Sequence, residues 1–116
     1  MSFRRSDCPL ACALDIIGDK WTLLILRDLL FGKTRYNEFL GSGEKIPTNI
    51  LAARLRHMEE AGLISGKPYR ERPRRYDYQL TETGRSLAPV IQVLTRWGAN
   101  AIPGTRRPRM ERMSRR

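Results

Sequence analysis

Hydrophobic residues recur at three- and four-residue spacing along most of the chain, which is the pattern of helices that bury one face. This spacing predicts helices over residues 8–17, 20–31, 33–40 and 46–63, and a last helix from 81 to about 101. Between the last two, residues 63–70 and 75–80 have an extended pattern and predict a β-hairpin joined through 71–74. The order of these elements predicts a mainly α domain with one small hairpin, an α+β fold.

The residues at the ends of the predicted helices agree with these limits. Proline suits a first helical turn and glycine suits an exit, and both occur where expected, at Pro9, Gly18, Gly32, Pro47 and Gly62. Asp19 is expected to cap the helix over 20–31. Gly41 and Gly43 are expected to permit the chain reversal before residue 46, and Pro89 to bend the last helix.

The stretch 46–63 has two different faces. Leu51, Leu55 and Met58 form its apolar stripe. Its other face carries small, amide and cationic side chains that can approach base edges, namely Thr48, Asn49, Ala52, Ala53 and Arg56. With a short helix and a turn before it, this stretch is expected to be the recognition helix of a helix-turn-helix.

The loop of the predicted hairpin is strongly basic. Between residues 67 and 76, five cations stand against the single anion Glu71: Lys67, Arg70, Arg72, Arg74 and Arg75. Basic hairpin tips are often simply solvated. Directly after a recognition helix, however, such a tip can lie over the sugar-phosphate backbone and insert an arginine into the minor groove.

Composition changes this picture in two ways. The 116 residues suit one domain, and the net charge of +10 favours a polyanionic partner. The charge is uneven, because residues 103–116 hold six arginines and one glutamate among proline and glycine. We therefore expect a domain over 1–102 and a disordered Arg-rich tail over 103–116 whose role stays open.

Several classes of protein lack support in this sequence. No secretory signal is visible, and the apolar run 21–31 is interrupted by Arg27 and Asp28, so a cytoplasmic protein without membrane contact is expected. Cys8 and Cys12 with the single histidine His57 make neither a disulfide framework nor a metal site. Without a carboxylate pair or a phosphate-binding loop, neither an enzyme nor a cofactor is expected.

Several motifs occur together and in order, and with them the chain resembles the HxlR-type bacterial transcription regulators over about residues 8–98. They are Cys8-Pro9, IGDKWT at 17–22, ILRDL at 25–29, Arg35-Tyr36, Arg54-Leu55, EEAGL at 59–63, YQLTETG at 78–84 and Trp97-Gly98. The resemblance implies a winged helix-turn-helix fold related to the MarR regulators. It also implies a homodimer joined through its terminal helices, bound to a roughly palindromic operator in double-stranded DNA.

The resemblance also assigns residues by position. Thr48, Asn49, Ala52 and Arg56 would enter the major groove, Arg72, Arg74 and Arg75 would serve the wing, and Lys33, Thr34 and Arg35 would touch phosphates. Leu10, Leu14, Ile91, Leu94 and Trp97 would lie at the dimer interface. Arg54 is open between an ion pair that holds the helix and a DNA contact. Pro47 stands where many family members have a serine or threonine cap.

Cys8 is the residue where the resemblance suggests chemistry, because some family members use a cysteine here to sense oxidants or electrophiles. Before Pro9, its thiolate would be stabilised by the helix dipole, with Arg4 and Arg5 nearby in the sequence and Asp7 opposing them. The alternative is a small residue without a redox role.

The sequence as a whole therefore predicts a dimeric DNA-binding regulator, with repression favoured over activation and any small-molecule effector unknown. The alternative is a small basic module that coats nucleic acid without sequence choice, or one that docks on proteins. Salt dependence separates the first two, because pure phosphate binding weakens alike for every sequence.

Overall fold

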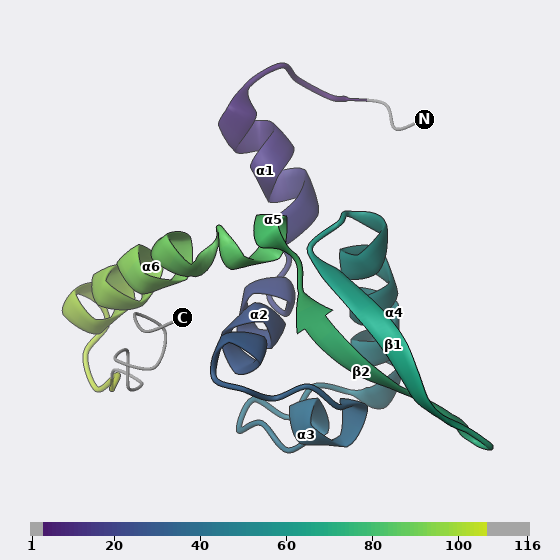
Figure 1. The fold of residues 1–116 in the computed structure, drawn as a ribbon. Coiled ribbons are helices and arrows are strands. Elements are labelled where there is room, and N and C mark those ends of the chain that lie inside the picture. Colours follow the sequence, from purple (N-terminus) through teal and green to yellow (C-terminus); the bar gives the residue numbers. More distant parts are fainter. Residues whose placement is uncertain (1–3, 107–116) are drawn as a thin grey trace.

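The computed structural model describes residues 4–106, which form six helices and one two-stranded antiparallel sheet. In chain order the elements are α1 (Pro9–Ile17), α2 (Thr22–Leu30), α3 (Tyr36–Leu40), α4 (Thr48–Glu60), β1 (Ile64–Glu71), β2 (Arg74–Leu80), α5 (Glu82–Arg85) and α6 (Ala88–Ala101) (Figure 1). The mainly α fold with a small hairpin is confirmed.

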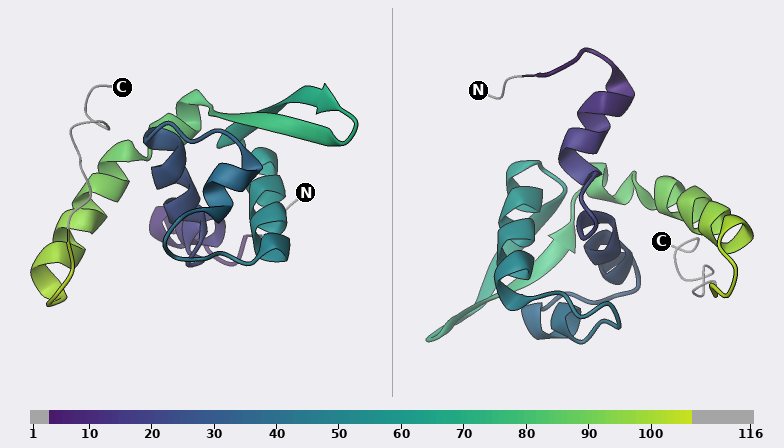
Figure 2. Two further views of the ribbon diagram at one scale, coloured as in Figure 1. Left: turned by 90° about the horizontal axis from the view of Figure 1, so that it is seen from below. Right: turned by 180° about the vertical axis from the view of Figure 1, so that it is seen from behind.

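The central body consists of α2, α3, α4 and the inner end of the hairpin. Its largest fully buried side chains include Leu26, Leu30, Phe39, Leu51 and Met58, which come from α2, α3 and α4. Each such side chain contributes roughly 2 kcal/mol through burial of apolar surface. Helices α1 and α6 and the hairpin tip extend from this body in three directions (Figures 1 and 2).

The hairpin is tied to the body by the segment that precedes α3. Its strands pair from Ile64 opposite Leu80 to Glu71 opposite Arg74, with an irregularity between Pro68 and Arg70. The backbone N–H of Tyr78 donates to the Thr34 carbonyl at 2.8 Å, next to an isolated bridge between residues 35 and 77. The hairpin is therefore held along one edge, and only its outer end projects.

Asp19 accepts hydrogen bonds at the start of the second helix, as predicted, although the N-cap residue of α2 is Trp21 and not Asp19. One carboxylate oxygen of Asp19 accepts the backbone N–H groups of Trp21 and Thr22, each at 3.0 Å. Burial raises the pKa of Asp19, but these bonds and one from the Thr22 hydroxyl outweigh it and lower the pKa overall. The helix begins at Thr22, two residues later than predicted.

The turn before α4 is made differently from the prediction. Gly41 has a φ of −77°, and the residue with positive φ is Lys45, at 58°. The expectation that Gly41 and Gly43 permit the reversal is therefore wrong. Pro47 precedes the helix as its N-cap residue, with a φ of −63° and a ψ of 147°, and Gly62 follows the helix end with a φ of 78°.

The single bent C-terminal helix that was predicted is two helices. Helix α5 ends at Arg85 and α6 begins at Ala88, so that Pro89 lies in the first turn of α6, where its missing N–H costs no helical hydrogen bond. The Thr81 hydroxyl caps α5 by accepting the Gly84 N–H at 3.1 Å, and it donates to the Gly62 carbonyl at 2.6 Å.

Residues 102–106 continue beyond α6, and most of the predicted Arg-rich tail, 107–116, lies outside the described residues. Within residues 4–106, no helix is long and apolar enough to cross a membrane.

Candidate nucleic-acid interface

Helix α4 presents to solvent the face that the sequence assigned to DNA. Its stripe Leu51, Leu55 and Met58 is buried. The four predicted base-reading residues, Thr48, Asn49, Ala52 and Arg56, are all exposed. The helix therefore offers polar and small side chains over its N-terminal two turns, as a major-groove contact requires.

Contacts from three other elements fix the orientation of α4. The Tyr36 hydroxyl donates to the Thr48 carbonyl at 2.8 Å at the start of the helix. An Arg54 guanidinium nitrogen lies 3.4 Å from an Asp19 carboxylate oxygen, and His57 Nε2 lies 3.0 Å from the Ile16 carbonyl. The ion pair favours the holding role of Arg54 over a DNA contact.

A polar network joins α2 to the turn between α3 and α4. Arg27 donates to both carboxylate oxygens of Glu44, at 3.0 and 2.8 Å, and this pairing raises the pKa of Arg27. The buried Asp28 contacts Arg27 and accepts the Ser42 hydroxyl. Lys33, a predicted phosphate contact, donates from Nζ to the Ser42 hydroxyl at 3.0 Å and so belongs to this network.

The other two predicted phosphate contacts hold the hairpin. Arg35 Nε donates to the Asp77 carboxylate at 2.8 Å, while its guanidinium carbon lies 3.7 Å from the centre of the Tyr69 ring. The Thr34 hydroxyl reaches the same carboxylate at 3.4 Å. The Arg35 hydrogen bond lowers the pKa of Asp77, which stays charged at neutral pH. Since the Arg35 side chain is still 48% exposed, it can also meet a ligand.

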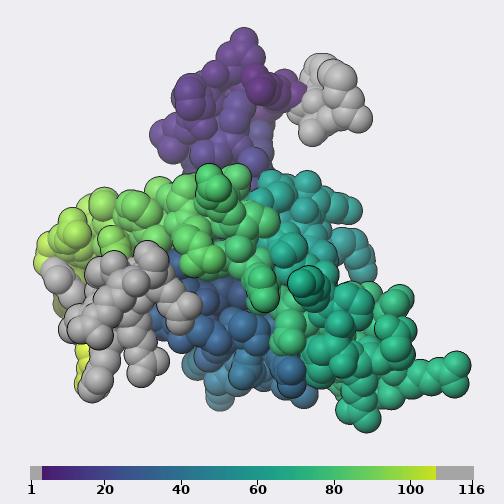
Figure 3. Space-filling model, viewed as in Figure 1, coloured from purple at the N-terminus to yellow at the C-terminus, as the bar shows by residue number. Residues whose placement is uncertain are grey.

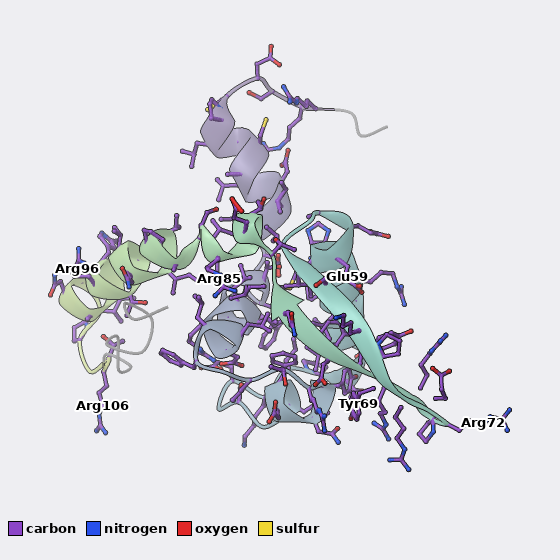
Figure 4. All side chains as sticks on the ribbon, viewed as in Figure 1. Glu59, Tyr69, Arg72, Arg85, Arg96 and Arg106 are labelled. Atoms are coloured by element: carbon purple, nitrogen blue, oxygen red, sulfur yellow. The ribbon has the colours of Figure 1, made fainter. Side chains whose placement is uncertain are left out.

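The hairpin tip gathers the predicted wing cations. The hairpin tip projects from the body of the molecule (Figure 3), and Arg72 lies exposed at its outer end (Figure 4). Arg74 is exposed and lies 3.5 Å from the Glu71 carboxylate. Arg75 is half-buried and stands directly opposite Arg70 in the register, so two like charges face each other across the hairpin.

A groove of about 300 Å³ lies between α3 and the hairpin. It is lined by four tyrosines, three arginines and two further polar residues: Tyr36, Tyr69, Tyr76, Tyr78, Arg35, Arg74, Arg75, Asn37 and Glu38. Burial raises the pKa of Tyr78, which therefore keeps its proton at neutral pH. Asn37, Tyr69 and Tyr76 were absent from the predicted site residues.

Apolar side chains are exposed on the two projecting helices. Leu10 is 66% and Leu14 48% exposed on α1, and Leu94 is 51% and Trp97 62% exposed on α6. Ile91 differs from the prediction, because it is only 6% exposed and packs into the core of its own chain. The prediction that Ile91 lies at the dimer interface is therefore wrong. The exposed valines of α6 are Val90 and Val93.

Cys8 is exposed at the N-cap position of α1, and Cys12, one turn on, is half-buried. The Cys12 thiol donates to the Ser6 carbonyl at 3.3 Å. Arg5 pairs with Asp15 at 2.7 Å, so its charge is shared with a carboxylate. In the described part of the chain, no three metal-ligating side chains lie close enough to hold an ion.

Three packed helices, an exposed second helix of the pair α3 and α4, and a hairpin beside it define a winged helix-turn-helix. The sequence profile of the HxlR-like helix-turn-helix family matches residues 16–106. The chain belongs to this family.

Two relatives illustrate the similarity in sequence. The uncharacterized HTH-type transcriptional regulator Rv3095 of Mycobacterium tuberculosis is 43% identical over 103 residues, which are 89% of this chain and 65% of that protein. The chain thus spans slightly less than two thirds of that relative. The uncharacterized HTH-type transcriptional regulator YdeP of Bacillus subtilis is 43% identical over 91 residues, 78% of this chain and 71% of the relative.

Solved structures agree with the fold. PA1607, a protein described as a putative transcription factor, superposes with a TM-score of 0.78 at 39% identity, covering 90% of this chain and 74% of its own. The redox regulator HypR in its reduced form superposes with a TM-score of 0.73 at 33% identity, and the match covers 80% of this chain and 92% of the HypR chain.

Proposed function

We propose that this chain is a sequence-specific transcriptional regulator that binds double-stranded DNA. The observation that carries the proposal is helix α4, whose polar N-terminal face is exposed while its orientation is fixed by Tyr36, Arg54 and His57. A base-reading helix needs such fixed placement, because hydrogen bonds to base edges tolerate little displacement.

The proposed readout divides the contacts between two grooves. Asn49 would hydrogen-bond an adenine edge in the major groove, Arg56 would reach a guanine or a phosphate, and Thr48 and Ala52 would meet thymine methyls. Beyond α4, the hairpin would act as the wing, with Arg72 in the minor groove and Arg74 and Arg75 at phosphates.

We propose that the regulator acts as a homodimer. The exposed apolar side chains Leu10 and Leu14 of α1 and Leu94 and Trp97 of α6 support this, because a second copy would remove them from water. A twofold dimer presents two α4 helices to two half-sites about 34 Å apart, which implies a roughly palindromic operator. Repression by covering a promoter needs only binding and is the proposed sign of regulation.

We also propose that the regulator responds to oxidants through Cys8. The thiol is exposed at a helix N-terminus, and the similar protein HypR is a redox regulator. With hydrogen peroxide as the oxidant, the thiolate sulfur attacks one peroxide oxygen and the O–O bond breaks, giving a sulfenic acid and hydroxide, which takes a proton from solvent to become water.

A binding titration tests the proposed function. The purified chain is mixed with labelled duplexes from the DNA upstream of its own gene, with an excess of random-sequence competitor. A complex that survives the competitor supports sequence-specific regulation. If the competitor removes every complex, the proposal of sequence-specific regulation is wrong, and the alternative holds that the chain coats nucleic acid without sequence choice.

Two variants sharpen this test. Asn49→Ala should weaken operator binding by roughly 10- to 100-fold, the value of one bidentate base contact, and leave binding to random DNA nearly unchanged. Equal losses of affinity for the operator and for random DNA would show that Asn49 does not read a base. Peroxide should release the operator from the wild type and from Cys12→Ser but not from Cys8→Ser, and release in all three would exclude Cys8 as the sensor.

A further inference from the structure

We propose that the groove between α3 and the hairpin holds the sugar-phosphate backbone of one DNA strand, with Arg75 and the Tyr76 hydroxyl on its phosphate. This inference rests on the proposed DNA binding, and it places the phosphate proposed for Arg75 of the wing inside this groove. It adds Tyr76, with Tyr69 and Asn37 beside it, to the interface.

The position of the groove is the first argument. In duplex DNA one sugar-phosphate strand separates the major groove from the adjacent minor groove. A protein that places α4 in one and a hairpin tip in the other must therefore straddle that strand. The groove lies between these two elements, because one wall includes Tyr36, which contacts the first residue of α4, and the other includes Arg74 of the tip.

The second argument is the charge at Arg75. Arg75 is a half-buried residue, and no residue among 4–106 forms an ion pair with it. It also faces Arg70 directly across the hairpin, a like-charged pair that destabilises the free protein. A phosphate in the groove would neutralise Arg75 and relieve this repulsion, so the pair of arginines favours a bound anion.

Glu38 is the one carboxylate in the lining of the groove. One of its oxygens accepts the backbone N–H groups of Thr34 at 2.8 Å and Arg35 at 3.0 Å. Its charge is thus directed toward α3's own backbone. Glu38 belongs to the α3 side of the groove, and the proposed phosphate lies nearer the hairpin and its arginines.

The tyrosine hydroxyls supply neutral donors. Within the described part of the chain, no group hydrogen-bonds the hydroxyl of Tyr69 or Tyr76, although both line the groove. The volume of about 300 Å³ accommodates a phosphodiester group with its sugar. A hydroxyl and a guanidinium on the same phosphate resemble the mixture of neutral and charged donors that positions proteins on DNA.

The test compares Tyr76→Phe and Arg75→Gln with the wild type on operator and random duplexes over a series of salt concentrations. Arg75→Gln should weaken binding to both and reduce the slope of log K against log salt by about 0.9, because one fewer counterion is released. Tyr76→Phe should weaken both by roughly tenfold with an unchanged slope, since a neutral donor releases no counterion. Arg85→Gln, on α5, removes an exposed cation outside the groove and serves as the control.

A second measurement locates the phosphate. Single phosphates of the operator are replaced by neutral methylphosphonates along the strand between the two grooves. At the bound phosphate, the replacement should weaken the wild type about tenfold and Arg75→Gln hardly at all, because the same interaction is removed twice. Thermal melting of each variant confirms that it remains folded.

The outcomes separate the two proposals. If the wild type binds duplex DNA while Tyr76→Phe and Arg75→Gln bind equally well and no phosphate couples to Arg75, the groove proposal is overturned and the proposed function stands. If both variants lose affinity but no phosphate couples to Arg75, the residues support the wing and do not contact a strand. If the wild type binds no duplex, the proposed function fails with it.

Discussion

Lys45 is strained in a way that the protein's neighbouring glycines are not. Its φ of 58° lies in the left-handed region, and among residues 4–106 it is the one non-glycine residue with positive φ. Such a conformation costs roughly 1–2 kcal/mol for a residue with a β-carbon. The strain lies two residues before the N-cap of α4, so it belongs to the turn that places the proposed recognition helix.

We therefore predict that Lys45→Gly stabilises the free protein by about 0.5–1 kcal/mol, because glycine adopts this conformation without steric cost. The measurement is the midpoint of thermal denaturation without DNA. Lys45→Ala removes the same charge but keeps the β-carbon, and it should give no such gain. Equal gains in both variants would assign the effect to the charge.

Asp77 determines what Arg35 can do. Since its carboxylate holds Arg35 against the hairpin, Asp77→Asn should release the guanidinium and remove a negative charge from the proposed interface. We expect tighter binding to random DNA, a slope of log K against log salt steeper by about 1, and weaker discrimination for the operator.

Fluorescence anisotropy with labelled duplexes measures these changes. Asp15→Asn breaks the comparable pair with Arg5 on α1 and should leave the slope unaltered. A slope unchanged in Asp77→Asn would mean that Arg35 does not reach phosphates even when it is free.

At the level of single residues, the sequence predicts which side chains face solvent. It predicts less well which groups those side chains contact. The exposure of Thr48, Asn49, Ala52 and Arg56 follows from helical period alone. The orientation of Tyr69 does not, because it lies in the irregularity between Pro68 and Arg70, where alternation along the strand is broken.

Among the elements, α3 is the shortest one in the proposed DNA interface. Its five residues could not form a stable helix alone, and Glu38 supports its start by accepting two backbone N–H groups. These bonds lower the pKa of Glu38 below its usual 4.5. Its contribution to stability is therefore complete above about pH 4.5 and is lost as the pH falls through the lowered pKa of the folded state.

The expected outcome is that Glu38→Gln melts at a lower temperature than the wild type at pH 6, and that this difference disappears toward about pH 3. Circular dichroism melts at several pH values make the comparison. Glu60→Gln, which removes an exposed carboxylate from α4, should show no such gap at pH 6. A gap that persists undiminished at pH 3 would contradict the capping role.

Helix α5 packs so closely that one position admits only glycine. A β-carbon on Gly84 would lie 2.0 Å from the Leu63 carbonyl oxygen and 3.2 Å from a Leu80 side-chain carbon. We predict that Gly84→Ala destabilises the fold by about 1–3 kcal/mol, because backbone must move to admit the methyl group.

Urea denaturation measures this loss. Gly43→Ala is the matched control, since a β-carbon there meets nothing within 4 Å, and it should change the stability little. A Gly84→Ala variant as stable as Gly43→Ala would mean that α5 can shift freely.

The elements themselves were largely predictable, and the exception is informative. Apolar residues continue at helical spacing through Leu87 and Ile91, so periodicity alone joins α5 and α6 into one helix. The break becomes visible only when Pro89 is treated as a first-turn residue and not as a bend. Likewise, only the packed structure separates Ile91, which faces its own core, from Leu94 on the same stripe.

At the scale of the whole molecule, α1 and α6 carry seven of the nine large apolar side chains that are exposed among residues 4–106. Trp97→Glu would place a charge in the proposed dimer interface, where burying it is costly. We expect a shift from dimer to monomer and weaker operator binding, since each monomer then reads one half-site alone.

Sedimentation velocity and the operator titration together measure the two effects. Gln79→Glu, which adds the same charge at an exposed position of β2, should leave the dimer intact. A Trp97→Glu variant that remains dimeric would show that α6 is not the contact.

The bonds that fix α4 have a consequence for how operators change over evolution. His57 contacts the last turn of α1, and Arg54 pairs with Asp19 just beyond it. The orientation of the proposed recognition helix α4 therefore depends on the orientation of α1. In a dimer joined through α1, the angle of α1 sets the distance between the two α4 helices. Substitutions near Ile16 could then alter the preferred number of base pairs between half-sites while every base contact stays the same, so operator spacing and operator sequence are separately inherited traits.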